Sequence, residues 1–269
     1  MRTIANASKS LFLFFSLCGI SQAHQEYPLK INNQYRTPAE QSRDQYRHPA
    51  ETLKFFNIKP TDTLVEVWPS AGWYTQILAP MLKDRGQYIA AHYAKNSPKN
   101  SHMISRAKFE QKFKNRIRRY GEIAVTSFEP PMHIKLAPTE TADVVLTFRN
   151  IHNWMSQNQQ QNVFNAIYDA LKPGGTFGVV EHKAKAGTSF SQMINTGYVT
   201  EDFIKQLALN TGFQFIASSN VNANPKDYKN YPYGVWTLPP TLALGEIGKK
   251  KYLAIGESDR MTLKFKKPI

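Results

Sequence analysis

Residues 65–80 read VEVWPSAGWYTQILAP, an apolar run that contains an acid, then a turn of small residues, then a second apolar run. The β-branched stretch at residues 63–67 predicts a buried strand. A helix is predicted over residues 73–82, with Ile77, Leu78, Met81 and Leu82 on one face. Pro80 is expected to kink this helix or to lie near its end. A strand, a tight turn and a helix in this order can form a cofactor-binding loop. This turn is therefore either a cofactor-binding loop or the remnant of one.

The same alternation continues along the chain and decides the fold class. Further strands are expected over residues 87–91, 123–128, 142–147, 176–180 and 213–217, with an edge strand where Met261, Leu263 and Phe265 alternate with polar residues. Helices are expected from Pro49, over residues 101–120, from a capping box at Ser156 and Gln159 to a stop at Lys172, and from Thr200 to Gly212. This order predicts an α/β fold, doubly wound around a mainly parallel sheet, whereas residues 218–251 show no helical period.

Length and composition indicate one folded domain behind an export signal. The chain has 269 residues and is 41% hydrophobic, enough for a single α/β core. Residues 1–23 are typical of a secretory signal peptide, with Arg2 and Lys9 before or at the start of a short apolar run and small residues before a cleavage site near Ala23. We therefore expect an exported, periplasmic protein without a membrane span after cleavage, with a polar arm of low order at residues 24–42 and the domain at 43–269.

Two alternatives to cleavage remain, an uncleaved anchor and a lipid attached at Cys18. The apolar run of residues 11–20 is about half the length of a membrane-spanning helix, and Leu17 stands where lipid-attachment signals have Gly, Ala or Ser. Both features favour cleavage, which would remove the single cysteine and with it any disulfide or thiolate chemistry.

The chain is strongly basic, with a formal net charge of +14. This charge favours anionic partners, namely an acidic small molecule, a lipid headgroup or a cell-wall polymer, while nucleic acid is not expected for an exported protein. Solubility is the competing explanation. In the basic segment at residues 101–120, the side chains of Phe109, Phe113, Ile117 and Tyr120 form one narrow stripe that is expected to face the core. The cations surround it, which favours a solvated helix over an anion-binding surface.

Candidate site residues follow the predicted strands directly. In an open α/β sheet the ligand lies beyond the carboxyl ends of the strands, so the residues there are the ones to consider. They are Glu66, Trp68, Ser70, Ala71 and Gly72 after the first strand, His92 and Tyr93 after the second, Arg149, Asn150 and His152 after the fourth, and Glu181 and His182 after the fifth.

Five segments, RDQYRHP, GWYTQILAP, FRNIHNW, LKPGG and DRMTLKFKKP, occur in this order between residues 43 and 268. Together they resemble class I S-adenosylmethionine-dependent methyltransferases, and most closely the exported members of that family. The resemblance implies a seven-stranded sheet whose last strand is antiparallel, and S-adenosylmethionine bound over the first two loops. The residues that it assigns to cofactor binding are Glu66, Trp68, Ser70, Ala71, Gly72, His92, Arg149 and Asn150.

The sequence departs from the family pattern at two cofactor contacts. Trp68 and Ser70 stand where glycines are usual, and Trp68 could either stack on a ligand or fill the pocket. The acid that usually ends the second strand and accepts hydrogen bonds from the ribose is absent, and His92 is its nearest substitute. A neutral imidazole accepts only one such bond, so we expect cofactor binding to be weakened or lost.

The sequence therefore supports two hypotheses: methyl transfer to a small molecule or an anionic envelope component, or a binding protein that kept the fold while its cofactor loop decayed. For methyl transfer, His152 or His182 is the expected general base, although His152 could instead pack or cap its loop. No metal is expected, because the adjacent Glu181 and His182 point apart in an extended strand. A nicotinamide-dependent oxidoreductase is disfavoured because the loop lacks G-x-G-x-x-G.

Overall fold

The computed structural model describes residues 31–269, so the predicted signal peptide lies outside the described range. Within that range a seven-stranded sheet has the order β3-β2-β1-β4-β5-β7-β6. The strands are β1 (Thr63–Val67), β2 (Gln87–His92), β3 (Ile123–Ser127), β4 (Ala142–Phe148), β5 (Leu171–His182), β6 (Gln214–Ser219) and β7 (Arg260–Lys266). Only β7 runs antiparallel to its neighbours, β5 and β6. The predicted fold class is confirmed.

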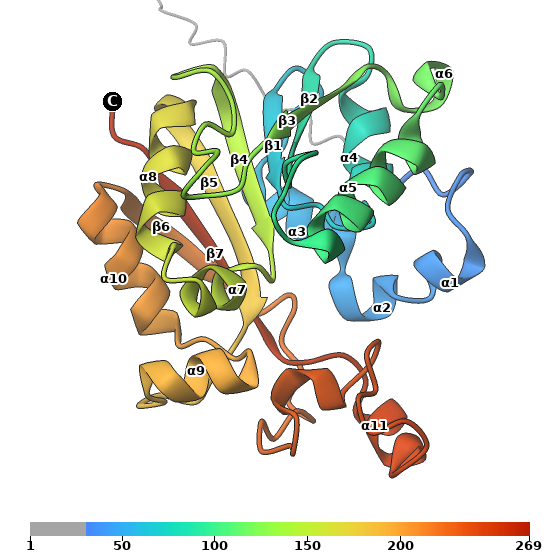
Figure 1. Cartoon of the computed structure of the whole chain (residues 1–269). Helices are drawn as coiled ribbons and strands as arrows, with labels where there is room; N and C mark the ends of the chain where they lie inside the picture. Colours follow the sequence, from blue (N-terminus) through green and yellow to red (C-terminus); the bar gives the residue numbers. More distant parts are fainter. Residues whose placement is uncertain (1–30) are drawn as a thin grey trace, which may run out of the picture.

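Helices cover both faces of this sheet (Figure 1). On one face, α3 (Pro49–Phe56), α4 (Thr75–Leu82) and α5 (Asn100–Phe113) share an apolar core with β1 and β2. On the other, the core contains α7 (Ile151–Ser156), α8 (Gln160–Ala170) and α10 (Glu201–Thr211). The remaining helices are α1 (Pro38–Gln41), α2 (Asp44–Arg47), α6 (Ile117–Tyr120), α9 (Phe190–Thr196), the 3-10 helix η1 (Gly234–Thr237) and α11 (Lys249–Ile255).

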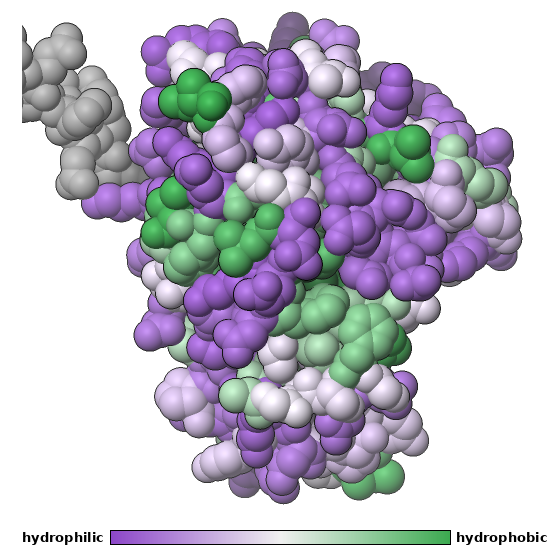
Figure 2. All heavy atoms as spheres, turned by 90° about the vertical axis from the view of Figure 1, so that its left-hand side faces the viewer, coloured by the Kyte–Doolittle hydropathy of each residue, from purple (hydrophilic) through white to green (hydrophobic). Residues whose placement is uncertain are grey.

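The central strands are buried on both faces, as their sequences predict. The residues of β1 from Leu64 to Val67 are all buried, and so is most of β4, because helices pack on each side of them. The outer face that carries α8 and α10 is mostly hydrophilic, with hydrophobic residues in separate patches (Figure 2). None of the helices in residues 31–269 has the length and hydropathy needed to cross a membrane.

The structure corrects two predicted elements. β7 is not an edge strand, because it lies between β5 and β6 and pairs with both, so β6 forms that edge of the sheet. The helix predicted over residues 101–120 is broken: α5 ends at Phe113, and Asn115 adopts a positive φ of 57° before α6 begins. This turn rotates Ile117 out of the predicted stripe to 68% exposure, whereas Phe109, Phe113 and Tyr120 are buried.

Three further details differ from the sequence prediction. Ser156 ends α7 instead of capping α8, whose N-cap is Gln159 and which ends at Ala170 rather than at Lys172. The expectation of low order is wrong for residues 31–42, where Arg36 bonds Asp44 and Glu40 bonds Lys112. Charged groups thus dock the arm onto the domain. In contrast, the long segment before β7 is irregular apart from η1 and α11, as its composition predicts.

Candidate ligand-binding site

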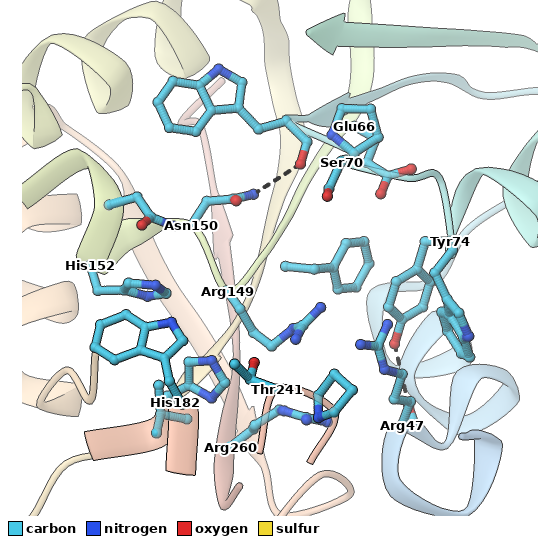
Figure 3. Close-up of a pocket in the computed structure, with 18 of the residues that line it drawn as sticks. Arg47, Glu66, Ser70, Tyr74, Arg149, Asn150, His152, His182, Thr241 and Arg260 are labelled. Carbon is cyan, nitrogen blue, oxygen red and sulfur yellow. Dashed lines mark hydrogen bonds between the residues drawn. The ribbon is translucent and has the colours of Figure 1, made fainter. Parts of the chain in front are cut away.

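A cavity of about 270 Å³ lies beyond the carboxyl ends of β1, β4 and β5 (Figure 3). Its position agrees with the rule for ligands on open α/β sheets. The segment 235–241, which includes part of η1, forms the wall opposite the strand ends. The sequence-predicted residues that line the cavity are Glu66, Trp68, Ser70, Tyr93, Arg149, Asn150, His152 and His182. Ala71, Gly72, His92 and Glu181 are not among its lining residues.

Three arginines from distant parts of the chain converge on the cavity. Arg47 ends α2, Arg149 follows β4, and Arg260 begins β7 (Figure 3). Burial, and next to it the charge of Arg260, lowers the pKa of Arg149 to about 10. Arg149 also has a positive φ of 62°, a conformation that is uncommon for a residue other than glycine and that is often found at functional sites.

A single buried carboxylate, Glu257, faces this group of cations. It is 2% exposed and accepts hydrogen bonds from Arg43 at 2.5 Å, from Arg47 at 3.4 Å and from Arg260. Burial alone would raise the pKa of Glu257, but the charges of Arg260 and Arg47 hold it well below its ordinary range. Glu257 therefore carries a full negative charge and still leaves the cavity with an excess of positive charge.

Two histidines stand on the other side of the cavity. His152 Nδ1 lies 3.2 Å from Glu181 Oε1, and His182 Nδ1 lies 2.5 Å from Ser258 Oγ. Since a carboxylate only accepts, Nδ1 of His152 is assigned the proton, which leaves Nε2 of this residue as an acceptor. Burial, followed by the charge of His152, lowers the pKa of His182 well below its ordinary value. His152 thus has the arrangement of a general base held by a carboxylate, whereas His182 is held neutral.

The ligand atoms of His152, Glu181 and His182 lie within 4.8 Å of one another, close enough to hold a metal ion. The prediction that Glu181 and His182 point apart is therefore wrong. However, Glu181 already accepts hydrogen bonds from the backbone N–H groups of Ile151 and His182, in addition to its contact with His152. The neighbouring arginines would also repel the positive charge of a metal ion. The surroundings of this cluster therefore favour an anion over a metal ion.

Trp68 packs into the protein interior. Its φ is +49°, its indole Nε1 donates to Phe128 O at 2.8 Å, and its ring lies 4.7 Å from that of Tyr93 and 6.0 Å from that of Trp154. These three partners follow β3, β2 and β4, so the indole occupies the space beyond the ends of these strands. Of the two possibilities that the sequence left open for this side chain, the geometry agrees with filling the pocket.

His92 is also fully engaged within the protein. Its Nδ1 accepts from the Tyr93 N–H at 2.8 Å, and its Nε2 lies 3.3 Å from Ser70 O. Burial lowers the pKa of His92 to about 4, so the ring is neutral and Nε2 carries the hydrogen that Ser70 O accepts. Both ring nitrogens have partners, and neither is free to accept a ribose hydroxyl in this conformation.

Gly72 approaches a helix rather than the cavity. A Cβ built at this position, where φ is +74°, would lie 2.5 Å from a ring carbon of Phe113 and 3.1 Å from one of Phe109. The neighbouring Ala71 is exposed, and its carbonyl accepts from Lys112. The glycine is thus required for packing against α5 and for the backbone conformation of the turn, and these two requirements explain it without a ligand.

Glu66 and Asn150 hold the loop that follows β1 in position. Glu66 accepts hydrogen bonds from Tyr88 at 2.5 Å and from Thr75 at 3.2 Å, and burial raises its pKa to about 7. Asn150 donates to Val67 O at 2.9 Å and also to Trp68 O at 3.5 Å (Figure 3), and so joins the end of β4 to the end of β1. Both side chains hold the loop in position and also present part of their surface to the cavity.

Sequence reasoning missed Arg47, Arg260 and Glu257 as site residues. Arg47 lies in the segment RDQYRHP and Arg260 in DRMTLKFKKP, and Glu257 lies two residues before the second segment. In the sequence, these segments carry the family resemblance and no other indication of a site. The two arginines are separated by more than 200 positions along the chain. The sequence shows only that each segment contains an arginine. The tertiary structure is needed to show that Arg47 and Arg260 line the same cavity.

No family model matches the chain, and neither does any curated protein. Three similar solved structures are a methyltransferase from Aquifex aeolicus that depends on S-adenosylmethionine, the cyclase SpnF, and phosphoethanolamine N-methyltransferase 2 from Haemonchus contortus in complex with S-adenosyl-L-methionine. The first has a TM-score of 0.56 at 14% identity and covers 84% of this chain and 93% of its own. For the cyclase the values are 0.57, 15%, 83% and 80%. For the third they are 0.54, 16%, 83% and 53%. With this sheet order, the chain has the fold of the class I S-adenosylmethionine-dependent methyltransferases.

Proposed function

We propose that this protein is an S-adenosylmethionine-dependent methyltransferase that acts on a small anionic molecule. The observation that carries the proposal is the arginine-lined cavity at the carboxyl ends of the central strands of a methyltransferase fold. One solved neighbour holds S-adenosyl-L-methionine, which supports this cofactor, and its named substrate, phosphoethanolamine, is small and carries a phosphate. A cavity of this size suits a molecule of that kind rather than a polymer.

Only part of S-adenosylmethionine fits the geometry of this chain. Glu66 and Arg47 line the cavity, where Glu66 could accept a hydrogen bond from an ammonium group and Arg47 could bind a carboxylate. The space beyond β2 and β3, where the resemblance expects the ribose, is closed by Trp68, His92 and Phe109. The adenosine part therefore does not fit unless Trp68 moves.

His152 is the side chain in the cavity that is placed to accept a proton. His152 lines the cavity, and because Glu181 holds its Nδ1, Nε2 is the nitrogen that can accept a proton when the ring is neutral. Such a group accepts a proton from an acceptor hydroxyl or ammonium, which is needed only when the methylated atom carries a proton. We therefore assign His152, rather than His182, as the general base of the proposed reaction.

A second candidate function is binding of the anionic molecule without methyl transfer. The specific observation in its favour is the indole of Trp68, which fills one side of the crevice with a side chain of the protein itself. A neighbour of this fold is named as a cyclase, so the fold is not restricted to proteins named as methyltransferases.

Calorimetry with S-adenosylmethionine and S-adenosylhomocysteine separates the two functions. We expect the wild-type protein to bind both weakly, with dissociation constants on the order of 0.1–1 mM, because the ribose contacts are missing. The control is the same titration with methionine, which lacks the adenosyl group. Transfer of a labelled methyl group to small phosphates or carboxylates would support methyl transfer. Absence of binding at millimolar concentrations of both ligands would contradict it and favour the binding protein.

We also propose that the protein is exported and acts in the periplasm on a small molecule or an anionic component of the envelope. The support is the sequence at residues 1–23 and the net positive charge, which is +12 after removal of Arg2 and Lys9. The mature protein is then expected to begin at His24. Mass spectrometry of the protein from a periplasmic extract checks this, and an intact N-terminal Met1 would contradict it.

A further inference from the structure

We propose that Arg47, Arg149 and Arg260 form a binding site for a small dianion, a molecule that carries a phosphate group or two carboxylates. This inference deepens the proposed function by naming the chemistry of the molecule that the cavity binds. It does not depend on cofactor binding or on methyl transfer, because the three arginines can bind an anion in either candidate function.

The first argument is the balance of charge. Arg43, Arg47 and Arg260 are all paired with the one carboxylate of Glu257, and Arg149 adds a further cation beside them. The other nearby carboxylates have different partners: Glu66 bonds Tyr88 and Thr75, and Glu181 bonds His152 and backbone N–H groups. Of these four cations only Arg47, Arg149 and Arg260 line the cavity. The single charge of Glu257 leaves two of the three unbalanced, and a dianion would balance them.

The second argument is the set of hydrogen-bond donors without a partner. Among the residues that the structure describes, Nη2 of Arg47 and Nε of Arg260 are buried and have no hydrogen-bond partner. Both side chains are nearly inaccessible, at 3% and 2% exposure. The guanidinium of Arg149, which is only partly buried, makes no hydrogen bond to any residue within 31–269 and points toward the centre of the site in Figure 3. Buried donors are normally satisfied, so these donors indicate an acceptor-rich ligand.

The third argument is the shape of the walls. The Arg47 guanidinium lies 4.5 Å from the centre of the Trp73 ring, which fixes its plane. Tyr74 and Phe148 stack face to face, with ring centroids 3.6 Å apart, and present an apolar surface beside the arginines. A planar guanidinium fork that is held in place matches the oxygens of a carboxylate or a phosphate. The aromatic wall and the volume of about 270 Å³ suit a small molecule with a short apolar part.

The dianion is distinct from S-adenosylmethionine. That cofactor carries one carboxylate, which one guanidinium satisfies through both of its oxygens, and its sulfonium and ammonium groups are positive. Three guanidiniums thus exceed what the cofactor can use. The excess is explained by a second, anionic molecule in the same cavity, which is the position that a methyl acceptor would take.

The test is calorimetry of the purified mature protein with inorganic phosphate, phosphoethanolamine and succinate, in the absence of any cofactor and at constant ionic strength. We expect at least one of them to bind at a single site, and Arg149→Gln to weaken that binding by about 10- to 100-fold, because a charge-assisted hydrogen bond is lost. Arg149 is chosen because its guanidinium has no hydrogen-bond partner within residues 31–269, so the substitution breaks no such bond in the described part of the chain. Comparing the titrations with the two phosphates and with succinate shows whether the site binds a phosphate group or a dicarboxylate.

Arg118→Gln is the matched control, since it removes the same charge from an exposed position outside the cavity. Its binding should equal that of the wild-type protein. Equal weakening by both substitutions would show a general effect of charge and would overturn the proposal, as would the absence of binding by all three anions. Circular dichroism checks that each variant is folded. Dianion binding without any cofactor binding would leave this inference intact and count against methyl transfer alone.

Discussion

Replacing Glu257 with Gln is expected to destabilise the protein by about 3–5 kcal/mol, because it removes the one carboxylate from a group of buried cations. Arg47 and Arg260 are nearly inaccessible to solvent, and neither has a second carboxylate in the described contacts to which it could turn. The glutamine side chain has almost the same shape, so lost packing does not contribute. Urea denaturation at neutral pH measures the change in the free energy of unfolding.

The effect should depend on pH in a definite direction. The pKa of Glu257 in the folded state is held below its ordinary value of 4.5, so its contribution to stability is complete above that pH and is lost as the pH falls toward the folded-state value. The difference between wild type and Glu257→Gln should therefore narrow below about pH 4.5. Glu246→Gln is the control, an exposed glutamate whose partner is Lys249. A difference that stays constant at acid pH would contradict the electrostatic explanation.

Replacing Trp68 with Gly is expected to have two opposite effects, a loss of stability and a gain in cofactor affinity. Removing this buried indole should cost about 3–5 kcal/mol, offset by about 1 kcal/mol because glycine adopts the positive φ of 49° without strain. The same change empties the space between the ends of β2, β3 and β4, where the adenosine part of S-adenosylmethionine would lie. We expect its dissociation constant to fall by at least about tenfold, or about 1.4 kcal/mol.

Denaturation and calorimetry on the same preparation measure both effects. Phe164→Ala is the matched control, since it also removes a fully buried ring from the same core but lies on α8 and does not line the cavity. It should lose stability without any gain in affinity. If Trp68→Gly loses stability and gains no affinity while it stays folded, the indole is not what excludes the cofactor, and the binding protein becomes the better candidate.

Most of the fold could be predicted from local sequence patterns. Buried parallel strands appear as continuous apolar runs, as at Thr63–Val67, and helix ends appear as caps, such as Thr200 and Gly212 around α10. The errors arose where a local pattern competes with its surroundings. The alternation of Met261, Leu263 and Phe265 resembles an edge strand, but β6 pairs with its outer side. The stripe that includes Ile117 continues in sequence, but Asn115 turns the chain.

The candidate site was predicted in part. Residues that directly follow strands, such as Arg149, Asn150 and His152, line the cavity because strand ends of a parallel sheet meet at one edge. Their environments could not be predicted, since burial and hydrogen-bond partners depend on side chains that are distant in sequence. His92 illustrates this: its position at the end of β2 was predicted, but its engagement with Ser70 O follows from the path of the neighbouring loop.

The sequence by itself determined the seven strands and the longer helices between them, the edge of the sheet at which the site lies, and the absence of both a ribose acid and the usual glycines from the loops. These are local properties, written in periodicity and in residue type. Only the tertiary structure decided that the indole of Trp68 turns into the interior and that Arg47, Arg149 and Arg260 line one cavity, two of them paired with Glu257. The physical reason is that charge balance and cavity volume are sums over all neighbours in space, and the neighbours of these residues come from both ends of the chain.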